Sequence, residues 1–76
     1  METEELKRRL GQILAEEEVQ PADWEAVAAM SAQLLDGAGD ELPAIVKDYL
    51  VGLERRRTDA VFAHAQRSKL TLYLRA

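Results

Sequence analysis

Apolar residues recur at steps of three and four along most of the chain, the spacing that places them on one face of an α-helix. Thr3 is a candidate N-cap for the first such segment, and the glutamates that follow it suit the positive end of a helix dipole. The apolar face of this segment consists of Leu6, Leu10, Ile13 and Leu14. The pattern predicts a first helix over residues 4–18.

A second helix is predicted over residues 21–36. Pro21 suits the first turn, because its fixed φ fits a helix and its missing N–H would be unbonded there. Gly37 and Gly39 follow, as glycines often do at a helix C-terminus. The helical spacing continues through Trp24, Val27, Met30, Ser31, Leu34 and Leu35. On this stripe we expect Trp24 to be a core anchor.

The remaining chain can be divided in two ways. A third helix is predicted over 41–54, with Asp40 as its cap and an apolar face of Leu42, Ile45, Val46, Tyr49, Leu50 and Leu53. If this helix ran on to residue 75, Arg56 and Arg67 would fall on the core face. We therefore expect a break between 54 and 59 and a fourth helix over 59–74, capped by Thr58. Its clustered residues would be Val61, Phe62, Ala65, Lys69, Leu72 and Tyr73.

Residues 69–75 also alternate apolar and polar side chains with a period of two, which is typical of a strand. A lone strand would have to pair with another copy or another protein. As a helix, the segment is apolar on more than one side and needs two neighbours. The fold class is therefore all-α, a small bundle of three or four short helices, with a strand over 69–75 as the alternative. Both alternatives favour an oligomer or a partner.

Length and composition point to one domain. The chain has 76 residues, enough for a single core, and 47% of them are hydrophobic, which argues against disorder. It contains no cysteine, so nothing requires an oxidising compartment. No stretch approaches the roughly 20 apolar residues that span a bilayer, and the acidic N-terminus is not a secretory signal. We expect a single helical domain, residues 1–76, in the cytoplasm and without membrane contact.

Charge is distributed unevenly along the chain. Residues 1–40 carry three basic and ten acidic side chains, a net charge of −7, whereas residues 41–76 carry seven basic and four acidic, a net charge of +3. Opposite charges of this kind either attract one another within the fold or simply keep it in solution, or they present a basic surface to an acidic partner. The acidic run 16–18 lies at the end of a helix, where anions are unfavourable, and is either frayed and solvated or a docking patch for arginines.

Side chains suited to catalysis are scarce. The chain has one histidine, His64, with no acidic or histidine neighbour one turn away, and no cysteine. Ser31 and Ser68 lie inside helical patterns, where serine commonly permits close helix approach. No Glu-x-x-His pair, calcium loop or glycine-rich phosphate loop is present. We therefore expect no enzymatic activity, no metal and no cofactor.

Two functional hypotheses follow. The first is a protein-interaction or assembly module, a homodimer that acts as regulator, adaptor or inhibitor, as small acidic helical proteins of bacterial type often do. Its candidate interface comprises Phe62, Leu70, Tyr73 and Leu74, with a rim of Arg55, Arg56 and Arg57. The alternative is a nucleic-acid-binding regulator that uses the basic C-terminal half. The net charge of −4 makes nucleic acid the less favoured partner.

Overall fold

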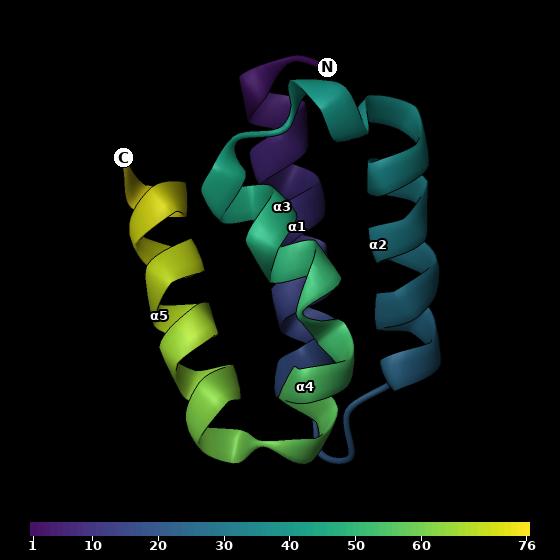
Figure 1. The fold of residues 1–76 in the computed structure, drawn as a ribbon, viewed down its shortest axis with the longest axis vertical. Coiled ribbons are helices and arrows are strands. Elements are labelled where there is room, and N and C mark those ends of the chain that lie inside the picture. The colour runs from purple at the N-terminus through teal and green to yellow at the C-terminus, as the bar shows by residue number, and fades with distance from the viewer. The chain divides into compact units, whose positions relative to one another are not determined.

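The computed structural model describes residues 1–76, and its regular structure is entirely helical. The elements in chain order are α1 (Thr3–Glu18), α2 (Trp24–Ala38), the 3₁₀ turn η1 (Gly39–Glu41), α3 (Ala44–Val51), α4 (Leu53–Thr58) and α5 (Ala60–Arg75) (Figure 1). The all-α prediction is confirmed, but the structure has five α-helices rather than the three or four that were predicted. The strand alternative for 69–75 is wrong, because α5 continues without interruption to Arg75. The chain forms two compact units, Met1–Glu41 and Leu42–Ala76.

The first unit is a pair of helices, α1 and α2, packed against one another. The predicted apolar stripes supply most of its buried side chains, with Leu10, Ile13 and Val27 fully inaccessible. Glu17 of the acidic run is also buried, at 4% exposed, although the sequence suggested a solvated run. Burying each such side chain is worth about 1.5–3 kcal/mol. The N-terminal amine lies 3.1 Å from a carboxylate oxygen of Glu41. The first and last residues of the unit are therefore in contact.

The loop between α1 and α2 corrects the expected start of the second helix. Pro21 lies outside the helix, and α2 begins at Trp24. Asp23 is the N-cap, because its carboxylate accepts a hydrogen bond of 3.0 Å from the backbone N–H of Ala26. Trp24 is half-buried rather than fully buried. At its other end α2 passes through Gly37 and stops at Ala38, two residues later than predicted.

The second unit contains three helices, because the predicted helix over 41–54 is divided. Asp40 lies in η1 and does not cap α3, whose N-cap is Pro43. Gly52 ends α3 with φ −82° and ψ 6°, values outside the α-helical range, and α4 starts at the next residue. The backbone N–H of Gly52 still donates to the carbonyl of Asp48 at 3.1 Å. The chain therefore bends at Gly52 while its hydrogen bonds are kept.

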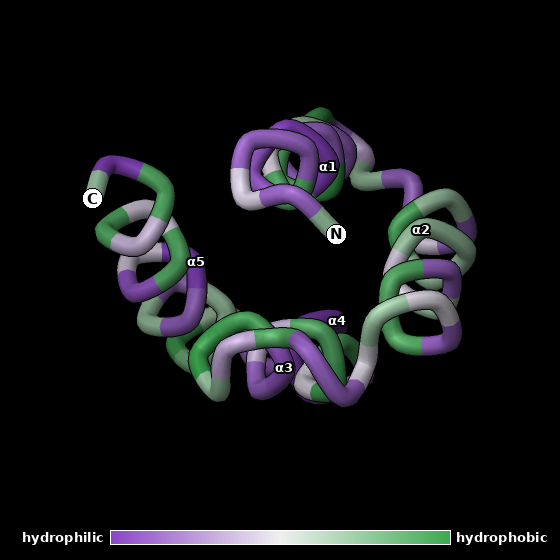
Figure 2. The backbone as a smooth tube through the Cα atoms, turned by 90° about the horizontal axis from the view of Figure 1, so that it is seen from above, coloured by the Kyte–Doolittle hydropathy of each residue, from purple (hydrophilic) through white to green (hydrophobic).

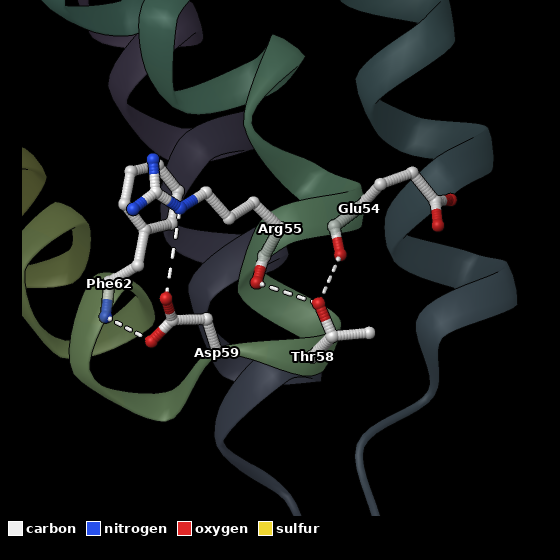
Figure 3. Close-up of polar contacts among 5 residues, drawn as sticks. All are labelled: Glu54, Arg55, Thr58, Asp59 and Phe62. Carbon is white, nitrogen blue, oxygen red and sulfur yellow. Dashed lines mark hydrogen bonds and ion pairs between the residues drawn. The ribbon is translucent and has the colours of Figure 1, made fainter.

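The break between α4 and α5 falls within the predicted 54–59 interval, but the capping residue differs. Asp59 is extended, and its carboxylate accepts a hydrogen bond of 3.0 Å from the N–H of Phe62 (Figure 3). Thr58 belongs to α4, where its hydroxyl lies 3.4 Å from the carbonyl oxygens of Glu54 and Arg55. The predicted Thr58 cap is wrong because this hydroxyl bonds back into α4.

The buried face of α5 also differs from the predicted one. Apolar positions are interleaved with polar ones along this helix (Figure 2). α5 packs on α3 and α4, and its buried residues are Ala63 and Leu70. Val61 and Leu72, which were expected to cluster with Phe62 and Tyr73, are 82% and 67% exposed. An apolar side chain therefore remains in solvent near each end of the helix.

Candidate functional site

The seven residues predicted to form an interface do not share one surface. Leu70 is completely buried and Arg56 is 2% exposed. The other apolar members, Phe62, Tyr73 and Leu74, are half-buried, whereas Arg55 and Arg57 are exposed. The interface predicted from the sequence therefore combines buried residues with exposed ones.

The outer two arginines of the basic run lie close to carboxylates of their own unit. The Nε of Arg55 is 3.7 Å from Asp59, and its guanidinium carbon lies 4.2 Å from the centre of the Phe62 ring (Figure 3). Arg57 lies 3.8 Å from a carboxylate oxygen of Glu54. Exposed pairs of this kind contribute little stability, but they reduce the positive charge that the run presents to solvent.

The middle arginine joins the three helices of the second unit. The Arg56 guanidinium stacks on the Tyr49 ring with 3.7 Å between its central carbon and the ring centre. Its Nη1 donates to the carbonyl oxygen of Tyr49 and, at 3.0 Å, to Oε1 of Gln66. The Gln66 amide in turn donates to the carbonyl of Asp48 at 3.3 Å. Charge-assisted hydrogen bonds and cation–π stacking make Arg56 a structural residue of this unit.

Gly52 provides the space that this arrangement needs. A Cβ at position 52 would lie 2.6 Å from Oε1 of Gln66, so the amide would have to move. We expect Gly52→Ala to lower the free energy of unfolding by about 1 kcal/mol, because displacing Gln66 breaks its bond to Arg56. Urea unfolding followed by circular dichroism measures the change.

Gly11 serves as the control for this prediction. It lies inside α1, and no atom of another element would contact its added Cβ within 4 Å. Gly11→Ala is expected to raise the free energy of unfolding by about 0.5–1 kcal/mol through helix propensity. Equal effects of the two substitutions would contradict the role assigned to Gly52.

The outer face of α5 carries a row of apolar and small side chains that we call the α5 seam: Val61, Ala65, Ser68 and Leu72. All four side chains are exposed, and the steps between them are four, three and four residues. This is the spacing of the a and d positions in a coiled coil, which face a second helix. His64 and Lys69 flank the seam, and α5 contains no acidic residue.

A groove of about 220 Å³ lies between α1 and α2 of the first unit. Buried Ile13 and Leu34 contribute apolar surface to it, and polar side chains of both helices line the rest, including Arg8 and Arg9. Both arginines lie near the same carboxylate, that of Glu5, at 3.7 and 3.2 Å. No serine, threonine or histidine lines the groove, and the structure contains no cluster of metal-ligating side chains.

Of the serines and the histidine considered as reactive groups, Ser31 lies on α2, apart from Ser68 and His64, which are one helical turn apart on α5. Ser31 is 4% exposed on the buried side of α2, and its hydroxyl has no hydrogen-bond partner. Ser68 and His64 are exposed on α5. Ser68 thus belongs to the α5 seam, a role that the sequence analysis did not assign to it.

The sequence analysis did not identify the α5 seam, because it grouped Val61, Ala65 and Leu72 with Phe62, Lys69 and Tyr73 and left Ser68 out. The signal was present in the sequence, since Val61, Ala65, Ser68 and Leu72 repeat with coiled-coil spacing. A second, competing stripe through Ala63 and Leu70 lies on the same helix, and the structure buries that one.

No helix in the structure has the length and apolar character needed to cross a membrane. The chain matches no known protein-family model, and neither curated proteins nor solved structures gave a significant match. Inferences about its function therefore rest on its own residues.

Proposed function

We propose that this chain is a non-enzymatic protein-interaction or assembly module that forms homo-oligomers in the cytoplasm and acts as a regulator, adaptor or inhibitor. The α5 seam is the contact surface. The observation that carries this proposal is the exposure of Val61 and Leu72, at 82% and 67%, on one face of the same helix. The centre of the proposed interface is therefore this pair of side chains rather than the apolar set predicted from the sequence, which was Phe62, Leu70, Tyr73 and Leu74.

Contact through the seam is favourable for two physical reasons. Removing a valine or leucine side chain from water is worth about 1.5–3 kcal/mol, and the seam offers one of each. Between them Ala65 and Ser68 are small, so a second helix can approach the backbone of α5 closely. Large side chains at the ends and small ones in the middle suit two helices that cross near the centre of α5.

The nucleic-acid alternative has less support. It relied on Arg55, Arg56 and Arg57 as phosphate contacts, but Arg56 is buried and each of the others lies within 4 Å of a carboxylate. Phosphate binding requires cations that can reach the backbone of the nucleic acid. Self-association through an apolar seam and binding to phosphates differ in their response to salt, which gives a direct way to separate them.

The test compares the intact chain with the double variant Val61→Ser/Leu72→Ser by sedimentation velocity over a concentration series at low and high salt. We expect the intact chain to self-associate at high concentration in both salts, because apolar contacts are not weakened by salt. The double variant is expected to remain monomeric, with an apparent dissociation constant raised at least tenfold.

Val51→Ser is the matched control. Val51 is 64% exposed and lies at the end of α3, outside the seam, so its replacement removes a similar apolar surface. This variant should self-associate like the intact chain. A chain that stays monomeric at every concentration refutes the proposal. If the chain binds a DNA or RNA duplex at low salt and releases it at high salt, the nucleic-acid alternative is supported instead.

A further inference from the structure

We infer that the partner of the α5 seam is a second copy of this chain, and that the two α5 helices pair antiparallel about a two-fold axis between Gln66 and Arg67. This inference rests on the proposed function and specifies its geometry. Along α5 the seam is large, small, small, large: Val61, Ala65, Ser68 and Leu72. The order is the same in both directions, as an isologous contact requires.

The two-fold axis fixes which residues meet. Positions equally far from the midpoint lie opposite one another, so Val61 meets Leu72 of the partner subunit and Ala65 meets Ser68 of the partner subunit. The two small layers lie at the centre, where the helices approach most closely, and a layer of large side chains lies on each side. Each helix therefore contributes all four exposed seam residues to the contact.

Residues beside the seam support the antiparallel direction. In an antiparallel pair, each flank of one helix meets the same flank of the other. This places His64 near Thr71 of the partner subunit and Lys69 near Phe62 of the partner subunit. His64 and Lys69 therefore lie on opposite flanks of the seam and do not face each other. Antiparallel helix dipoles also attract.

A parallel pair would bring like groups together. His64 would then face Lys69 of the partner subunit on both flanks, and Arg75, which continues the seam after Leu72, would meet its own copy. Because α5 has no acidic side chain, nothing on the helix would offset these contacts. In the antiparallel pair the two Arg75 residues lie about 25 Å apart along the axis, given a rise of about 1.5 Å per residue.

The seam is short, which sets the expected strength of the pair. It spans residues 61–72 and thus about 18 Å of helix. Stable interfaces bury about 800 Å² on each partner, more than one face of a helix this long provides. We therefore expect a reversible dimer that forms at micromolar or higher concentrations.

The direction of pairing is tested with engineered disulfides, since the chain has no cysteine of its own. Val61→Cys and Leu72→Cys are mixed in equal amounts in a glutathione redox buffer, at a concentration where the intact chain is dimeric. Antiparallel pairing brings position 61 next to position 72 of the partner, whereas the two copies of position 61 lie about 16 Å apart, beyond disulfide reach. We expect the mixed disulfide to exceed either homodisulfide at least tenfold.

Each outcome has a distinct meaning. Homodisulfides in excess would show a parallel pair and overturn this inference while leaving the proposed function intact. A mixed disulfide no more abundant than that between Val51→Cys and Leu72→Cys would show that the dimer uses another face. A monomeric intact chain would overturn both. Nitroxide labels at Arg75→Cys give a second readout, with a long interspin distance for the antiparallel pair and a short one for the parallel pair.

Discussion

Leu70→Ala and Leu72→Ala are expected to have opposite consequences although the two leucines lie two residues apart on α5. Leu70 is completely buried, so its truncation should lower the free energy of unfolding by about 3 kcal/mol through lost burial and a cavity. Leu72 is 67% exposed, and its truncation should change stability by less than about 0.5 kcal/mol. Leu72→Ala should instead weaken self-association.

Two measurements on both variants check this pair of expectations. Thermal or urea unfolding at a fixed low protein concentration gives the stability, and sedimentation velocity at high concentration gives the association. If Leu70→Ala is stable but no longer self-associates, Leu70 belongs to the interface, as the sequence predicted. An unfolded Leu72→Ala variant would show that Leu72 belongs to the core.

Arg56→Ala should be as damaging as the loss of a core leucine. The substitution removes a 2%-exposed side chain that stacks on Tyr49 and leaves the acceptors on Tyr49 and Gln66 without this donor. Hydrogen bonds to a charged group contribute about 1.5–3 kcal/mol each, so we expect a loss of about 3 kcal/mol. That is a large fraction of the roughly 5–15 kcal/mol by which domains are stable.

Arg57→Ala is the matched control for this prediction. Arg57 follows directly in α4, but half of its side chain is exposed and its ion pair with Glu54 is 3.8 Å long. Its removal should change the unfolding midpoint by an amount close to the error of the measurement. If Arg56→Ala and Arg57→Ala unfold at the same urea concentration, the structural role of Arg56 is refuted.

Local sequence patterns were sufficient for much of the architecture. The apolar stripe Leu6, Leu10, Ile13, Leu14 predicted α1 within one residue, because only one face of that segment is apolar. The interruption before Asp59 was also anticipated, since a continuous helix would have left arginines on a core face. Strong periodicity with one solution determines a helix and its buried side before any tertiary contact is known.

Helix ends were harder to predict because several residues near each end can cap. Pro21 and Asp23 both suit the start of α2, and Thr58 and Asp59 both suit the start of α5. In each case the aspartate caps, and its carboxylate accepts from the N–H three residues later. Both capping bonds need the backbone of the aspartate to leave the helical range, which the residue type alone does not determine.

The orientation of α5 depends on contacts that its own sequence does not encode. The helix has two apolar stripes, one through Leu70 and one through Val61 and Leu72, so periodicity allowed either to be buried. Packing on α3 and α4 places Gln66 against Gly52, which puts Leu70 inside and Leu72 outside. Arg56 is buried for a related reason, since its hydrogen-bond acceptors come from α3 and α5. A pattern of hydrophobicity records which side chains can be buried, and the partners available in space determine which of them are.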